Sequence, residues 1–90
     1  MSGDTKIKIY GNTSCGYCTA ARLLLKKKGL DYEDIPVSND AQAFAEMREK
    51  SGSASVPQIF INDRAIGGFD ELYELEESGE LNELIGTQET

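Results

Sequence analysis

The sequence predicts an α/β domain with a four-stranded mixed sheet flanked by helices, in the order βαβα, then ββα and a final short helix. Two observations lead to this class. In the first half of the chain, segments with strand-like and helix-like apolar spacing alternate, which is typical of parallel strands joined by helices. In the second half, a hairpin signal adds antiparallel strands. The chain of 90 residues is long enough for one domain, 1–90, with a core of about residues 5–86.

The first half of the chain contains two predicted strands and one clear helix. Residues 6–10 alternate polar and apolar side chains and are predicted to be a strand, although this topology places the charged Lys8 in a central strand. Residues 17–28 have helical apolar spacing and are predicted to be a helix with Gly29 as its C-terminal cap. Residues 31–37 are polar on both faces and contain a proline, so we expect an edge strand.

The second half is predicted to hold a helix, a hairpin and two further helices. Residues 39–51 are expected to form a helix with Asn39 as its N-cap. Residues 58–61 and 64–67 are predicted to be short strands on either side of an Asn-Asp turn. An acidic helix and a short final helix follow, and are expected to end at Gly79 and Gly86.

The charge of the chain bears on its partners and its location. The net charge is −7, divided into +5 over residues 1–29 and −12 over residues 30–90. Such a chain is repelled by nucleic acid and by anionic membranes, so we expect small molecules and proteins as partners. No apolar run exceeds three residues, so we expect neither a membrane span nor a secretory signal. We therefore expect a cytoplasmic protein.

Two cysteines in the segment Cys15-Gly16-Tyr17-Cys18 are the main candidates for chemistry. The chain has no histidine, so it cannot supply four zinc ligands alone. A Cys-X-X-Cys motif between a strand and a helix is typical of redox proteins. Cys15 is expected at the helix N-terminus, which favours the thiolate, and is the predicted nucleophile. Cys18, one turn further, is the predicted resolving thiol. A buried pair without chemistry and a partial metal site are the alternatives.

Four short segments, spread over roughly residues 5–86, belong together: Cys15-Gly16-Tyr17-Cys18, Ser55-Val56-Pro57, Gln58-Ile59-Phe60-Ile61 and Gly67-Gly68-Phe69-Asp70. In this order and spacing the chain resembles the glutaredoxins, small glutathione-dependent proteins of thioredoxin-like fold. The resemblance implies a thiol–disulfide oxidoreductase that reduces protein–glutathione mixed disulfides and protein disulfides. It further implies roles in electron transport and cell redox homeostasis, and a monomeric apo protein.

The same resemblance implies a glutathione site. A cis bond before Pro57 would turn the Val56 backbone toward the cysteines, where it would pair with the cysteinyl backbone of glutathione. The γ-glutamyl carboxylate would bind amides at the start of the acidic helix, with its ammonium on Asp70. Tyr17 is expected either beside the reacting sulfur or in the helix core. The implied glutathione-binding residues are Tyr17, Val56, Pro57, Gly68, Phe69 and Asp70.

Two positions depart from the pattern of the family and concern the glycyl carboxylate of glutathione. Many glutaredoxins have Lys three residues before the first cysteine, where this chain has Asn12. Phe44 stands where Gln or Arg is often found. We therefore expect weaker or altered glutathione binding. Four other side chains are candidate substitutes for these anchors: Lys8, Arg22, Gln42 and Arg48.

Two alternative functions stay open at this point. Gly16 stands where many glutaredoxins have proline, and some members without that proline bridge a [2Fe–2S] cluster in a dimer. Its ligands would be Cys15 of each chain and two bound glutathiones. A redoxin reduced by an enzyme like thioredoxin reductase is the other alternative, because the carboxylate anchors are missing.

Overall fold

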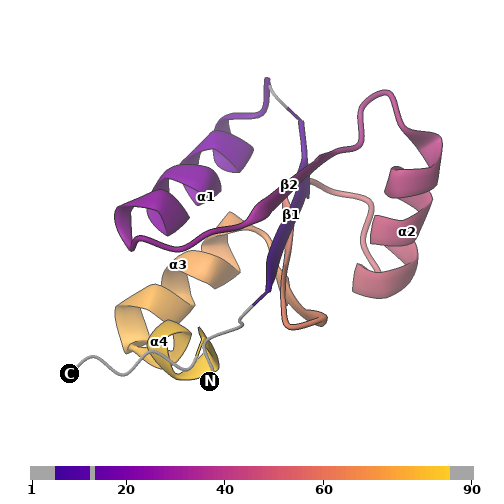
Figure 1. Ribbon diagram of the computed structural model, residues 1–90. Helices are drawn as coiled ribbons and strands as arrows, with labels where there is room; N and C mark the ends of the chain where they lie inside the picture. Colours follow the sequence, from indigo (N-terminus) through magenta and orange to yellow (C-terminus); the bar gives the residue numbers. More distant parts are fainter. Residues whose placement is uncertain (1–5, 13, 86–90) are drawn as a thin grey trace.

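The computed structural model of the protein describes residues 6–12 and 14–85, and the predicted helix stop at Gly86 lies outside them. These residues form a four-stranded sheet and four helices in the predicted order (Figure 1). None of the described helices has both the length and the apolar character needed to cross a membrane. The elements are β1 (Ile7–Gly11), α1 (Gly16–Lys27), β2 (Glu33–Pro36), α2 (Ala41–Ser51), β3 (Gln58–Ile61), β4 (Arg64–Gly67), α3 (Phe69–Ser78) and α4 (Glu80–Ile85).

The sheet has the strand order β2-β1-β3-β4 and is mixed, as predicted. β1 runs parallel to β2 and antiparallel to β3, and β3 pairs antiparallel with β4. The polar strand β2 lies at an edge, in agreement with its composition. Asn62 and Asp63 form the hairpin turn with φ of 53° and 67°, a left-handed backbone that asparagine and aspartate adopt more readily than most residues.

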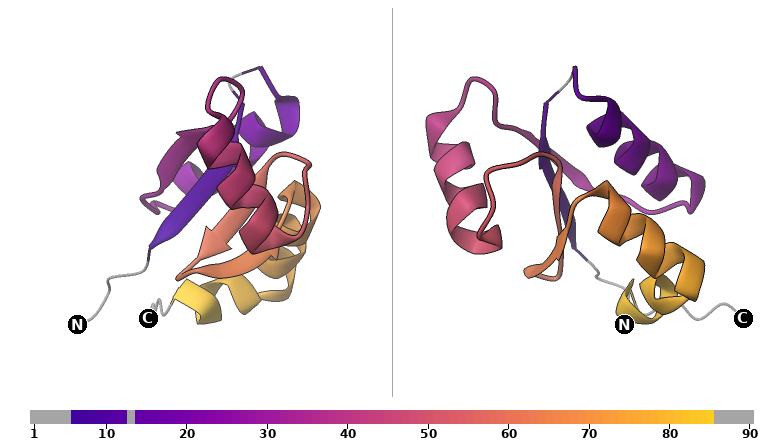
Figure 2. Two further views of the ribbon diagram at one scale, coloured as in Figure 1. Left: turned by 90° about the vertical axis from the view of Figure 1, so that its right-hand side faces the viewer. Right: turned by 180° about the vertical axis from the view of Figure 1, so that it is seen from behind.

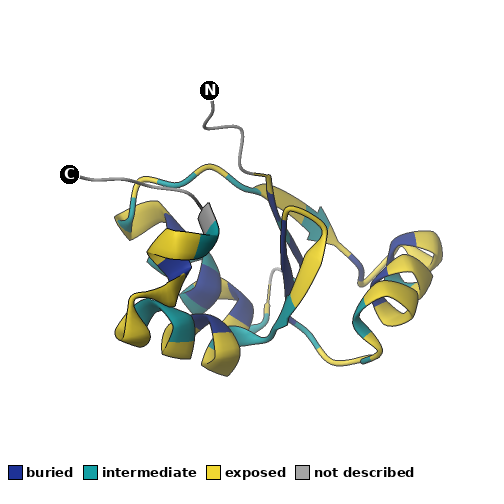
Figure 3. Ribbon diagram, turned by 90° about the horizontal axis from the view of Figure 1, so that it is seen from below, coloured by how far each residue is buried: buried dark blue, intermediate teal, exposed yellow. Residues whose placement is uncertain are grey.

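The helices lie in two layers on opposite faces of the sheet. α1, α3 and α4 cover one face, and α2 is on the other side (Figures 1 and 2). Side chains alternate along β1, so Ile7 and Ile9 face the first layer and Tyr10 faces α2. Figure 3 shows the buried residues along the sheet and on the inner sides of the helices. The larger core consists of Ile7, Ile9, Ala21, Leu25, Ile59, Ile61, Leu72 and Leu81, and the smaller one of Tyr10, Val37, Ala43, Met47 and Phe60.

The charge of Lys8 in a central strand has a local explanation. Lys8 is half-buried and lies opposite Phe60 of β3, on the α2 side of the sheet. Glu46 of α2 is near enough that Lys50 and, more weakly, Lys8 lower the pKa of its carboxyl group. Glu46 also forms an ion pair with Lys50, one helical turn further along α2, at 3.1 Å. The Glu46 carboxylate therefore partly offsets the charge in the sheet.

The helix ends differ from the predictions by about one residue. Asp40, not Asn39, is the N-cap of α2, since its Oδ1 accepts a hydrogen bond from the Ala43 N–H at 3.1 Å. Both residue types are good caps, so the sequence did not distinguish them. Gly29 ends α1 as predicted: its φ is 75°, and its N–H donates to the Lys26 carbonyl at 2.9 Å.

Candidate active site

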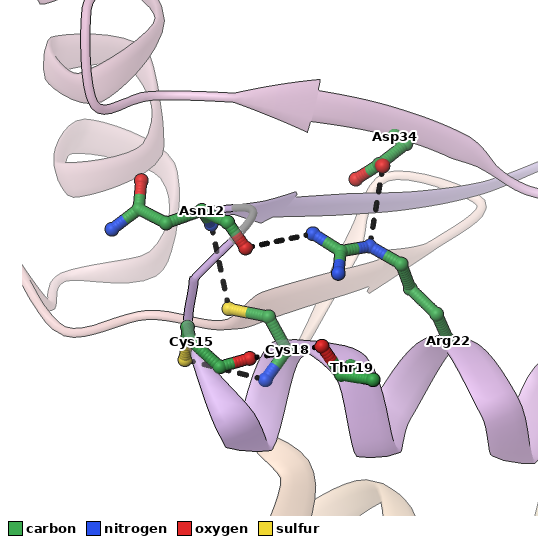
Figure 4. A network of polar contacts seen from close by, with 6 residues as sticks. All are labelled: Asn12, Cys15, Cys18, Thr19, Arg22 and Asp34. Atoms are coloured by element: carbon green, nitrogen blue, oxygen red, sulfur yellow. Dashed lines mark hydrogen bonds and ion pairs between the residues drawn. The ribbon is translucent and has the colours of Figure 1, made fainter.

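Cys15 occupies the N-cap of α1, directly after the junction with β1. Its side chain is partly exposed, and its Sγ accepts a hydrogen bond from the backbone N–H of Cys18 at 3.3 Å (Figure 4). The N-cap position brings the sulfur to the positive end of the helix dipole and to amides with no intrahelical acceptor. This geometry stabilises a thiolate, which is the nucleophilic form of cysteine.

The two thiols have opposite electrostatic environments. Partial burial by itself raises the pKa of Cys15, but hydrogen bonds from the Cys18 thiol and from the Cys18 and Tyr17 amides outweigh it. The pKa of Cys15 is therefore lowered. Burial and the neighbouring Cys15 raise the pKa of Cys18 to about 11. At neutral pH, Cys15 is the better nucleophile and Cys18 remains a neutral thiol.

The end of β1 fits closely around Cys18. The Cys18 side chain is fully buried, and its Sγ accepts a hydrogen bond from the Asn12 N–H at 3.5 Å. A Cβ atom at Gly11 would lie 2.6 Å from that sulfur, so any larger residue would have to displace the thiol. Gly11 therefore sets the place of the second thiol. Gly11 was not among the residues predicted for the site; a glycine that ends a strand next to a Cys-X-X-Cys motif was the available signal.

Arg22 lies one turn of α1 after Cys18. Its Nη2 donates to the Asn12 carbonyl at 3.0 Å, and its Nε lies 3.2 Å from Asp34 Oδ2 in an ion pair (Figure 4). That approach lacks hydrogen-bond geometry, since the buried Nε has no hydrogen-bond partner among the described residues. The Arg22 charge contributes to lowering the pKa of Cys15. Arg22 was predicted as a candidate carboxylate anchor, but its contacts hold the loop between β1 and α1.

Substituting Arg22 with Met is expected to raise the pKa of Cys15, because a cation near a thiol favours its ionised form. The rate at which iodoacetamide alkylates Cys15, followed over pH by mass spectrometry of the peptide, measures this pKa. The midpoint of the rate profile should move to higher pH in Arg22→Met. Lys27→Met removes a charge from the exposed far end of α1 and should leave the midpoint in place. An unchanged midpoint in Arg22→Met would contradict the assigned role.

A groove of about 410 Å³ lies beside the thiols and contains all six predicted glutathione-binding residues. Tyr17 forms part of its wall, and the bond between Val56 and Pro57 is cis, as expected. Neither cysteine is among the lining residues, but Cys15 precedes α1 and lies two residues from Tyr17. The groove is lined by Tyr17, Ser51, Ser53, Ser55, Val56, Pro57, Gln58, Gly67, Gly68, Phe69, Asp70 and Glu71.

Tyr17 lies outside the core, so the core position expected as one of two alternatives is wrong. Its side chain is 65% exposed, and its ring stacks on Phe69 of α3 with centroids 6.2 Å apart and an interplanar angle of 29°. Phe69 in turn contacts the ring of Tyr73 at 5.9 Å. The helical spacing suggested a core position for Tyr17, but the buried face of α1 consists of Cys18, Ala21 and Leu25 and leaves Tyr17 outside it.

The start of α3 forms the opposite side of the groove. The Gly68 N–H donates to Glu71 Oε1 at 2.8 Å, so this amide is already occupied. The amides of Phe69 and Asp70 lie in the first turn, where a helix offers no acceptor to its own N–H groups. A Cβ at Gly68 would lie 3.3 Å from the Pro57 carbonyl oxygen, so glycine allows these two segments to approach closely. The exposed side chain of Asp70 stands at the same helix end.

The two positions that depart from the family pattern share a second depression, of about 540 Å³. Asn12 and Phe44 line it together with Asp40, and Val56 lines both this depression and the groove. None of its described lining residues is cationic. Asn12 Oδ1 is buried there without a hydrogen-bond partner among the described residues. None of the four candidate substitutes lines either hollow: Lys8, Arg22, Gln42 and Arg48.

Comparisons with known proteins agree with this arrangement. The family model described as Glutaredoxin matches residues 7–66. The chain is 45% identical over 84 residues to glutaredoxin 1 of Rickettsia typhi, which covers 91% of this chain and 81% of that protein. It is 40% identical over 79 residues to glutaredoxin 3 of Escherichia coli K12, and the match covers 88% of this chain and 95% of that protein. The crystal structure of a buckwheat glutaredoxin–glutathione complex superposes with a TM-score of 0.81 at 28% identity. The superposition covers 93% of this chain and 79% of the buckwheat chain.

Proposed function

The chain belongs to the glutaredoxin family, is a thiol–disulfide oxidoreductase of thioredoxin-like fold, and, we propose, acts on glutathionylated proteins with glutathione as its co-substrate. The observation that carries the proposal is the groove beside an N-capping thiol whose pKa is lowered. The solved buckwheat neighbour is a complex with glutathione, which supports glutathione as the occupant of such a groove.

The first route uses Cys15 alone. The Cys15 thiolate attacks the glutathionyl sulfur of a protein–glutathione mixed disulfide, forming a Cys15–glutathione disulfide. The protein sulfur leaves as a thiolate and takes a proton from water. The thiolate of a second glutathione then attacks the glutathionyl sulfur on Cys15, which releases oxidised glutathione and restores the Cys15 thiolate. In the net exchange one free glutathione thiol is consumed, one protein thiol is released, and the mixed disulfide is replaced by oxidised glutathione.

The second route reduces protein disulfides and needs Cys18. Cys15 attacks one sulfur of the disulfide, and Cys18 then attacks the Cys15 sulfur, which frees the second protein thiol and closes the Cys15–Cys18 disulfide. Cys15 contributes to the high pKa of Cys18 through a hydrogen bond and through its charge. Both contributions end when Cys15 enters a mixed disulfide. The resolving thiol therefore becomes easier to ionise at the step that uses it.

The groove is proposed to bind the cysteinyl and γ-glutamyl parts of glutathione more firmly than the glycyl part. The Val56 backbone pairs with the cysteinyl unit, and the Phe69 and Asp70 amides bind the γ-glutamyl carboxylate. The glycyl carboxylate falls toward the depression lined by Asn12 and Phe44, which lacks a cationic lining residue. Glutathione binding is therefore expected to depend mainly on the γ-glutamyl end.

The proposal includes a cytoplasmic location, because exchange of this kind requires a reduced glutathione pool with a potential near that of glutaredoxins, about −200 to −230 mV.

The cluster-bridged dimer and the reductase-coupled redoxin remain predictions. A Cβ at Gly16 would meet no atom within 4 Å, so the space around this residue does not distinguish them. Visible absorbance after anaerobic purification would identify the cluster carrier, and reduction only by a flavoenzyme would identify the redoxin.

The test compares two mixed disulfides of one peptide, carrying glutathione or 2-mercaptoethanol, each assayed with excess glutathione. Turnover should favour the glutathione adduct by about tenfold or more, because only it offers the γ-glutamyl groups to α3. Asp70→Asn should raise the KM for the glutathione adduct and leave the other adduct unchanged. Asp63→Asn, at the hairpin turn, is the matched control. Equal turnover of both adducts would contradict a glutathione-binding groove.

A further inference from the structure

A ladder of three aromatic rings leads away from the active site along α3. Tyr17 stacks on Phe69, and Phe69 contacts Tyr73 with an interplanar angle of 32°. Three large hydrophobic side chains are exposed among the described residues, and two of them belong to this ladder: Tyr17 is 65% and Tyr73 is 47% exposed. The third, Leu23, is 60% exposed on α1. Aromatic rings clustered in water beside a reactive thiol indicate a contact surface.

The surroundings of the ladder are acidic. The segment 69–85, which forms α3 and α4, contains seven acidic residues and no Lys or Arg. Glu77 lies one helical turn after Tyr73 and is exposed, and Asp70 and Glu74 are exposed neighbours of the ladder. Glu76 is already paired with Lys28, at 2.8 Å. Lys27 lies about 15 Å along α1 from Tyr17, so its charge is far from the start of the ladder.

The ladder lies where the polypeptide of a glutathionylated substrate would contact the protein. Tyr17 and Phe69 also line the groove, so the ladder continues directly from the proposed glutathione site. A protein joined by a disulfide to glutathione in that groove must bring its own chain across the adjoining surface. Aromatic rings bordered by carboxylates attract cations, and the planar guanidinium of Arg stacks well on such rings.

We propose that the Tyr17–Phe69–Tyr73 ladder and the acidic face of α3 select substrate segments that carry Arg or Lys beside the glutathionylated cysteine. This inference rests on the proposed function and names the polypeptide class that the same site prefers. The acidic side chains favour a cationic residue in the substrate, and the aromatic rings determine where its side chain stacks. Because part of the attraction is between exposed charges, the preference weakens with ionic strength.

The experiment measures kcat/KM for two glutathionylated peptides that differ only at the residues flanking the cysteine, Arg in one and Glu in the other. The mixed disulfide of glutathione and 2-mercaptoethanol, which has no peptide, serves as the reference substrate. We expect the Arg peptide to exceed the Glu peptide by about tenfold at low salt. The ratio should fall at higher salt, and the reference substrate should show a much weaker dependence.

Variants separate the aromatic contribution from the charge. Tyr73→Leu keeps an apolar side chain but removes the ring, and should lower the Arg-to-Glu ratio about three- to fivefold. Glu77→Gln should lower it about twofold. Turnover of the reference substrate should stay unchanged in both, since neither residue lines the groove. Leu23→Ala and Glu49→Gln, which change an exposed apolar residue and an acidic residue of α2, are the matched controls.

Equal kcat/KM for both peptides, with the reference substrate turned over, would overturn the inference and leave the proposed function intact. An undiminished ratio in Tyr73→Leu would overturn the role of the ladder. If no glutathionylated substrate is turned over, the proposed function fails, and binding decides the inference. Arg and Glu peptides with serine in place of cysteine would then be titrated by NMR. Shifts at Phe69 and Tyr73 for the Arg peptide alone support the ladder, and their absence overturns it.

Discussion

Cys15→Ser is expected to abolish turnover of glutathionylated substrates, lowering kcat/KM by at least about a thousandfold. A serine hydroxyl at the N-cap of α1 still accepts the Cys18 N–H hydrogen bond, so the fold is retained. It is not ionised at neutral pH and cannot form a disulfide, so the first step has no nucleophile. Turnover coupled to reduction of the oxidised glutathione product measures the loss.

The matched variant is Cys18→Ser, which leaves Cys15 in place. It should turn over glutathionylated peptides within about tenfold of the unchanged protein, because that route needs one thiol. It should lose the reduction of peptides with an internal disulfide, where the resolving attack is required. If Cys18→Ser were inactive on glutathionylated peptides and Cys15→Ser active, the roles of the two cysteines would have to be exchanged.

Leu72→Ala is expected to lower the free energy of unfolding by about 2 to 5 kcal/mol. Leu72 is the fully buried residue of α3, and it joins that helix to Leu25 of α1 and to the sheet in the larger core. Native domains are stable by only about 5 to 15 kcal/mol in total, so this loss is a large fraction. Thermal unfolding followed by circular dichroism should show a Tm lower by about 10 to 25 °C.

Leu23→Ala is the control for this prediction, because it makes the same chemical change at a side chain that is 60% exposed. It should change the free energy of unfolding by about 0.5 kcal/mol or less. A Tm for Leu72→Ala close to that of Leu23→Ala would mean that α3 is not held by this contact. The groove would then need another explanation for its shape.

Most of the fold followed from local patterns. The strands 58–61 and 64–67 agree with the prediction residue for residue, since a two-residue Asn-Asp turn pairs Ile61 directly with Arg64. The polar character of β2 correctly indicated a sheet edge. Helix starts were less certain, because Asn39 and Asp40 are both good caps and only the geometry of the Ala43 amide decides between them.

The site was predicted less completely than the fold. The cysteine motif and the groove residues could be predicted because they form a recognisable pattern. The structure brings the six predicted glutathione-binding residues into one groove. The roles of Gly11 and Arg22 depend on contacts across segments that no local spacing reveals. Tyr17 shows the limit of helical periodicity, which identifies an apolar stripe but not where the covering layer ends.

The division of the core into two clusters has a consequence for local opening. α2 is held to the sheet by two buried side chains, Ala43 and Met47, whereas the helices of the other layer share one larger core. Segments with few buried contacts open at a lower free energy than the whole molecule, so the amide hydrogens of α2 should exchange with solvent before those of α1. Both thiols are on the α1 side of the sheet. Opening of α2 would therefore first change the depression beside Phe44, and it would reach the redox pair through Asn12, which lines that depression and donates to Cys18 Sγ.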